Sequence, residues 1–184
     1  MDSNYIESVI KQFTYYKSLG DKTFIQLNDE DIHWKPNEYS NNIAIITKHI
    51  VGNMLSRWTN FLTEDGEKKW RHRDSEFEDS YNSKEEMILA WEKGWQCLFD
   101  AVTPLKVEDL DRIIYIRNEG HTALEAINRQ LTHYAYHIGQ IVFLGTLIKN
   151  NDWKSLSIPK NQSSNYNKDK FGKEKHRGHF TDDL

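Results

Sequence analysis

The chain has 184 residues, a length that favours one domain with room for a sizeable core. Its formal net charge of −4 gives no reason to expect binding to nucleic acid or to an anionic membrane surface. A single cysteine excludes an intrachain disulfide framework, and the lack of a secretion signal or of an apolar run of roughly 20 residues predicts a cytoplasmic protein without a membrane span.

Four segments carry apolar residues at helical spacing. The first is expected over 2–19, with Gly20 as its stop signal, and the second opens at 40 or 41 and runs to 62. The third is expected to begin after Ser83, which forms a capping box with Glu86. The fourth is expected to start at 118 or 119 and to continue without a proline to 149.

The linking segments are more irregular. An extended loop is expected over 26–36, residues 68–80 are highly charged, and the β-branched run 113–117 suggests a short extended stretch. From Pro159 the composition turns polar, which predicts an irregular C-terminal extension over 158–184 behind a helical domain over 1–157.

Four amphipathic helices without a credible sheet predict an all-α fold, a four-helix bundle. The first and third connections are fairly long, so a simple up-down-up-down order of the helices is not assured.

Three histidines stand out on the second and fourth of these helices. His133 and His137 are four residues apart, so both imidazoles lie on one helical face. His49 falls on the apolar side of the second helix. Three inward imidazoles could hold a divalent metal with one position left open. The alternative is that they are ordinary histidines, hydrogen-bonded to neighbours within the bundle.

Other residues could support such a centre. Asn53, one turn after His49, could contact a ligand, and Arg57 and Arg129 could bind an anionic substrate group or form surface ion pairs. His121 lies about 120° around the expected helix from His133 and could act as an acid or base at the rim, or be merely exposed.

The remaining reactive side chains have simpler interpretations. Cys97 fits a small buried hydrophobe better than a nucleophile. His176 and His179, in the polar tail, are typical of solvated residues.

The motifs together resemble those of the DinB-like superfamily. The resemblance rests on the histidine within 48–54 and on the H-x-x-x-H run with the Ile-Gly-Gln that follows it, over 133–141. The segments 56–68 and 91–95 resemble an uncharacterised bacterial branch of that superfamily.

The resemblance covers residues 1–157 and implies a four-helix bundle of atypical connectivity, often a homodimer, with zinc or nickel on His49, His133 and His137. Characterised relatives include bacillithiol transferases and mycothiol-dependent isomerases. The expected function is therefore a metal-dependent enzyme acting on a small-molecule substrate, such as a low-molecular-weight thiol S-transferase. A metal-dependent hydrolase and a non-catalytic, metal-stabilised dimeric bundle remain open alternatives.

Overall fold

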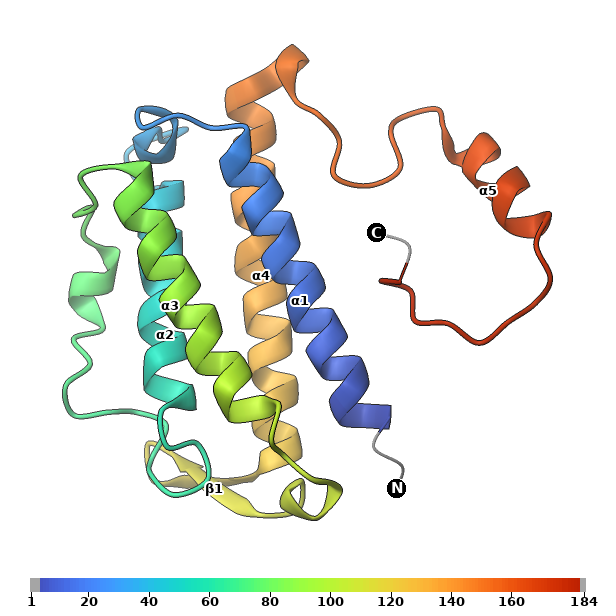
Figure 1. Ribbon diagram of the computed structural model, residues 1–184. Helices are drawn as coiled ribbons and strands as arrows, with labels where there is room; N and C mark the ends of the chain where they lie inside the picture. Colours follow the sequence, from blue (N-terminus) through green and yellow to red (C-terminus); the bar gives the residue numbers. More distant parts are fainter. Residues whose placement is uncertain (1–3, 183–184) are drawn as a thin grey trace.

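Helices dominate the computed structural model, which describes residues 4–182 (Figure 1). The four long ones are α1 (Asn4–Ile25), α2 (Ile43–Trp58), α3 (Lys84–Val102) and α4 (Ala123–Lys149). The shorter helical elements are η1 (Asp31–His33), η2 (Asp74–Phe77), η3 (Val107–Asp109), η4 (Asn150–Asp152) and α5 (Ser163–Phe171). The predicted all-α class is confirmed, apart from one small two-stranded sheet.

The long helices share one core. Helix α2 packs along α3 and α1 along α4, and further contacts join α2 to α4 and α1 to α3. Each long helix supplies one aromatic ring to the centre, and the contacting rings lie 6.0 to 6.3 Å apart between centroids. These rings belong to Phe13, Trp58, Trp95 and Tyr134, all at most 2% exposed. Burial of such large side chains is a major stabilising contribution.

Helices α2 and α3 run in the same direction, as Figure 1 shows. The connection between them, residues 59–83, therefore returns along the length of α2 and places η2 against that helix. The sequence pointed to the first and third connections as the long ones, whereas this second connection causes the departure from up-down-up-down order. It also supplies residues to the site described below.

The bounds of α1 and α2 differ from expectation. Helix α1 continues past Gly20 to Ile25, and its expected start at Asp2 lies outside the described residues. Gly20 is buried, and a Cβ there would lie 2.5 Å from Cζ2 of Trp91, so the glycine permits close helix packing instead of ending the helix. Helix α2 is shorter than expected and begins after Asn42, whose side chain accepts a hydrogen bond from the backbone N–H of Ile45.

Helix α3 begins where the sequence predicted. The Ser83 hydroxyl accepts from the backbone N–H of Glu86 at 3.2 Å. The Glu86 carboxylate, however, accepts from the backbone N–H of Asn82 at 2.8 Å. In the expected capping box it would accept from the backbone N–H of Ser83.

A hairpin precedes α4, contrary to the expectation that the chain has no sheet. Strands β1 (Ile113–Ile116) and β2 (Glu119–Thr122) pair antiparallel across a two-residue turn. Both turn residues, Arg117 and Asn118, have positive φ, as in the hairpin turns that match strand twist. The predicted extended stretch is thus confirmed, but α4 starts four or five residues later than expected, behind a capping box of Thr122 and Glu125.

The C-terminal segment is only partly irregular. It contains α5 and then returns to α1, where His179 lies 3.1 Å from the Ser8 hydroxyl and the Phe180 ring packs on Tyr15. His176 is exposed as predicted, whereas His179 is half-buried between Ser8 and Thr181 and is therefore less solvated than predicted.

Candidate metal centre

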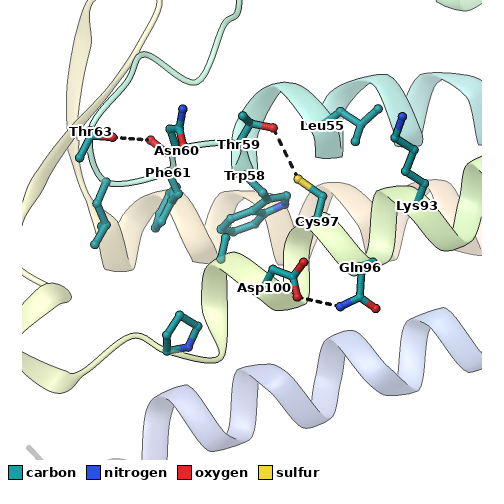
Figure 2. A pocket seen from close by; sticks show the side chains of 13 residues that line it. Leu55, Trp58, Thr59, Asn60, Phe61, Thr63, Lys93, Gln96, Cys97 and Asp100 are labelled. Carbon is teal, nitrogen blue, oxygen red and sulfur yellow. Dashed lines mark hydrogen bonds between the residues drawn. The ribbon is translucent and has the colours of Figure 1, made fainter.

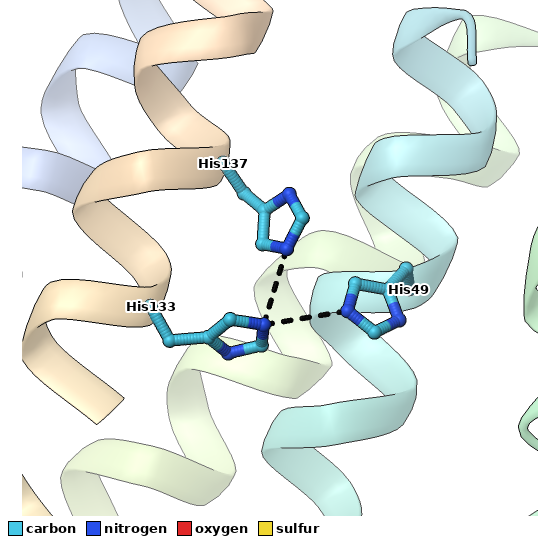
Figure 3. A group of neighbouring side chains, drawn as sticks. All are labelled: His49, His133 and His137. Atoms are coloured by element: carbon cyan, nitrogen blue, oxygen red, sulfur yellow. Dashed lines mark hydrogen bonds between the residues drawn. The ribbon is translucent and has the colours of Figure 1, made fainter. Parts of the chain in front are cut away.

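Three imidazoles from two helices converge on one point (Figure 3). His133 and His137 project from successive turns of α4 and meet His49 of α2. The Nε2 atom of His133 lies 3.4 Å from that of His49 and 3.1 Å from that of His137. The three potential ligand atoms all lie within 4.8 Å of one another. The structure therefore brings together the three histidines that the spacing had singled out.

Two of the three histidines, His49 and His137, are held in orientation by a hydrogen bond at Nδ1. Nδ1 of His49 donates to a carboxylate oxygen of Glu76 at 2.9 Å, and Nδ1 of His137 donates to the amide oxygen of Gln140 at 2.8 Å. When Nδ1 carries the proton of a neutral imidazole, Nε2 presents a lone pair. Both lone pairs point toward His133, whose single Nε2 proton can satisfy only one of them. A bound cation would satisfy all three nitrogens.

The surroundings of His133 and His137 favour neutral imidazoles. Burial, together with the nearby His137, His49 and arginine charges, lowers the pKa of His133 to about 3. Burial also lowers the pKa of His137. Neutral imidazole is the form that binds a metal, so protons compete weakly for these nitrogens at neutral pH.

The donor set fits a first-row divalent ion. Zinc lies about 2.0–2.1 Å from imidazole nitrogens, which places tetrahedral ligands about 3.3–3.4 Å apart. The separations of 3.4 and 3.1 Å are close to that spacing. Three imidazoles leave at least one coordination position for an exogenous group.

Glu76 is a residue of this centre that the sequence did not reveal. It comes from η2, in the connection between α2 and α3, and its side chain is almost fully buried. Arg71 binds it through two hydrogen bonds, of 2.7 and 2.9 Å. Burial opposes its ionisation, but the bonds from His49 and Arg71 outweigh burial and lower the pKa of Glu76. The carboxylate therefore stays charged and fixes the orientation of His49.

A cavity of about 200 Å³ opens beside two of the histidines. Besides His49 and His133, its lining is entirely polar and mostly basic: Asn53, Arg57, Arg71, Arg73, Arg117, Arg129 and Gln130. An exogenous group could therefore reach His49 and His133 through this cavity.

Three of the predicted supporting residues line this cavity. Asn53 is buried and accepts a hydrogen bond from the Tyr134 hydroxyl, which in turn accepts from Nε1 of Trp58. Arg57 is only 6% exposed, so its role as a surface ion pair is excluded. Its Nη1 donates to the Gly66 carbonyl and to Glu67. Arg129 is on α4 and lines the cavity.

His121 does not belong to the site. It lies on strand β2, paired with Ile114, so the helical angle expected for it was wrong. It does not line the cavity, although its Nε2 is buried without a hydrogen-bond partner among the described residues.

A larger hollow lies elsewhere. A shallow groove of about 730 Å³ lies between the ends of α2 and α3, where Cys97 is 3.6 Å from the Thr59 hydroxyl (Figure 2). No histidine lines it. Cys97 is half-buried beside Trp58 and Phe61, in agreement with a packing role.

These features define a mostly helical protein with a three-histidine cluster that could hold a metal ion. A family model described as "Protein of unknown function (DUF1572)" matches residues 1–162, and the chain belongs to this family. No curated protein and no solved structure matches the chain. Within residues 4–182, no helix combines the length and apolar character that crossing a membrane requires.

Proposed function

We propose that this protein is a divalent-metal-dependent enzyme whose ion is held by His49, His133 and His137. The observation that carries the proposal is the convergence of three Nε2 atoms beside a polar cavity. A structural histidine cluster would need neither the outward hydrogen bonds that aim these lone pairs inward nor an access route. We propose zinc or nickel as the metal, because both accept imidazole nitrogen.

The residues divide into ligands and supports. Glu76 and Gln140 hold two imidazoles in the orientation that exposes Nε2. Phe77 stacks on the His49 ring with centroids 5.0 Å apart and shields it from solvent. A divalent ion in this position supplies Lewis acidity, which lowers the pKa of a thiol or water that approaches through the cavity.

We propose a low-molecular-weight thiol of the bacillithiol type as one substrate and S-transfer as the reaction. The support is the resemblance to DinB-like proteins, together with four long helices arranged around one core, as expected for a bundle of that type. A thiolate is itself the nucleophile, whereas a hydrolase commonly adds a general base. None of the described residues that line the cavity is a carboxylate, which favours the thiol over the hydrolase alternative.

The test is consumption of thiol by the zinc- or nickel-loaded protein. Bacillithiol or a related thiol is supplied with an electrophile such as monochlorobimane, and loss of free thiol is followed. We expect turnover by the wild type and by Cys97→Ser, and none by His133→Ala. A metal-loaded wild type without turnover on any thiol would contradict the transferase and leave the non-catalytic bundle.

We also propose that the protein forms a homodimer, as the resemblance implies. Helix α4 carries exposed Tyr136, Phe143 and Leu147 on one face, which is the surface such a dimer could cover. Molar mass by light scattering tests this proposal.

A further inference from the structure

Five arginines surround the cavity beside the histidines, and they come from separate parts of the chain. Arg57 is on α2, Arg71 and Arg73 on the connection that follows, Arg117 on the hairpin turn and Arg129 on α4. Guanidinium groups repel one another when they converge, so a fold that collects five of them needs compensating negative charge.

The carboxylates of this part of the chain compensate only some of that charge. One oxygen of Glu67 accepts from Arg57 at 3.1 Å and from Arg71 at 3.2 Å, and it lies 3.3 Å from the Arg117 guanidinium. The only other carboxylate partner of these five arginines in residues 4–182 is Glu76, which Arg71 and His49 already share. A metal ion on the histidines would add further positive charge.

Two of the arginines have no carboxylate partner among residues 4–182. Within the described residues Arg129 forms no ion pair, and the guanidinium of Arg73 lies over the Phe77 ring at 5.2 Å. Both remain available to a charged ligand.

Two deeply buried side chains of the cavity each have one polar atom without a hydrogen-bond partner in the described part of the chain. Arg57 is 6% exposed and its Nε–H donates to nothing, and Gln130 is 3% exposed and its Oε1 accepts from nothing. Leaving a buried polar group unpaired destabilises the folded state. A donor and an acceptor without protein partners, on two residues that line one cavity, agree with a site that a ligand completes.

From these observations we infer that the cavity binds the anionic oxygens of a small substrate, a carboxylate or a phosphoryl group, with Arg57 and Arg129 as the main contacts. The inference rests on the proposed function, since it assigns the substrate class of the same site. A volume of about 200 Å³ equals the space of about seven water molecules, so it accepts a small acid or the charged end of a larger molecule. Guanidinium binds such oxygens through paired, charge-assisted hydrogen bonds.

The experiment is calorimetric titration of succinate, inorganic phosphate and the neutral isostere succinamide into metal-free and zinc-loaded protein. The variants are Arg129→Gln, which removes an exposed and unpaired arginine, and Arg112→Gln as control. Arg112 is paired with Asp109 outside the cavity, so its substitution changes net charge equally.

We expect succinate or phosphate to bind the wild type and Arg112→Gln alike, to bind Arg129→Gln about tenfold more weakly, and succinamide not to bind. The anion that binds with the higher affinity then shows whether the site prefers a carboxylate or a phosphoryl group. Binding of succinamide as strong as that of succinate, or equal weakening in both variants, would overturn the inference.

Metal content measured on the same samples separates the two proposals. Protein that takes up no zinc yet binds an anion through Arg129 contradicts the metal enzyme and leaves the anion site. Protein that takes up zinc but binds neither anion contradicts the anion site alone.

Discussion

Glu76 reaches His49 only because residue 52 has no side chain. Gly52 lies on α2 one turn after His49, and a Cβ at this position would overlap the carboxylate of Glu76. The glycine is thus part of the candidate metal centre, although it bears no functional group. Displacing the carboxylate would free His49 to rotate and to change its tautomer.

Gly52→Ala therefore tests the role of the supporting carboxylate. We expect metal affinity to fall by about 10- to 100-fold, the usual effect of losing a partner that orients a ligand. Competition with a chromophoric chelator measures it. Gly139→Ala is the control, because a Cβ there meets no other atom within 4 Å. Equal metal affinity in both variants would show that Glu76 does not support His49.

The histidines were predictable from sequence, whereas Glu76 was not. A spacing of four on a helix is local information, and His49 lies on a helix whose apolar face is readable. Glu76 lies in the charged segment 68–80, which has no periodicity, and it meets His49 only through the path of the connection that returns along α2. Contacts set by a long connection carry no local sequence signal.

At the scale of elements, Asp65 joins the hairpin to the connection between α2 and α3. Its carboxylate accepts from the backbone N–H groups of Arg117 at 2.9 Å and Asn118 at 2.8 Å, and also from that of Glu67. These bonds fix the turn that carries Arg117 to the cavity. Burial raises the pKa of Asp65, but the N–H groups outweigh burial and hold it below the ordinary value of 3.8.

Because this pKa is lowered in the folded state, the stabilisation by Asp65 is fully present above pH 3.8 and is lost as the pH falls through the folded-state value. Asp65→Asn imitates the protonated state at neutral pH. We expect faster hydrogen exchange at the amides of Arg117 and Asn118 in this variant, with metal content unchanged. Exchange as slow as in the wild type would mean that the strand pairing alone holds the turn.

The hairpin also shows where sequence patterns were insufficient. The run 113–117 was readable as extended, but the turn uses Arg117 and Asn118 in place of the glycine-containing pairs that mark such turns. Residues 119–122 were assigned to the helix because the whole run 119–149 contains no proline. The capping pair Thr122 and Glu125 was the available signal for the true start.

At the scale of the whole molecule, the C-terminal segment contacts α1 and lies away from the metal centre. Lys11 pairs with Asp182 at 2.8 Å, and Phe180 packs on Tyr15. We expect a chain ending at Ser157 to keep its metal content and to melt a few degrees lower. Metal analysis and thermal unfolding measure this, and loss of metal on truncation would contradict the predicted division between 1–157 and 158–184.

The metal should also stabilise the fold as a whole, because it joins α2 to α4. A ligand that binds only the folded state at 100 times its Kd adds about 2.7 kcal/mol to the free energy of unfolding. We expect thermal unfolding at a clearly higher temperature with zinc than with chelator, and no such difference in His137→Ala. An equal rise in the unfolding temperature of His137→Ala would mean that zinc binds at another site.

The most direct test of the account is metal content by plasma mass spectrometry on untagged protein purified without chelator, beside His133→Ala. The account predicts about one divalent metal per chain in the wild type and almost none in the variant. A wild type that is empty and takes up neither zinc nor nickel on reconstitution would contradict it and leave three ordinary histidines, hydrogen-bonded to one another and to their neighbours.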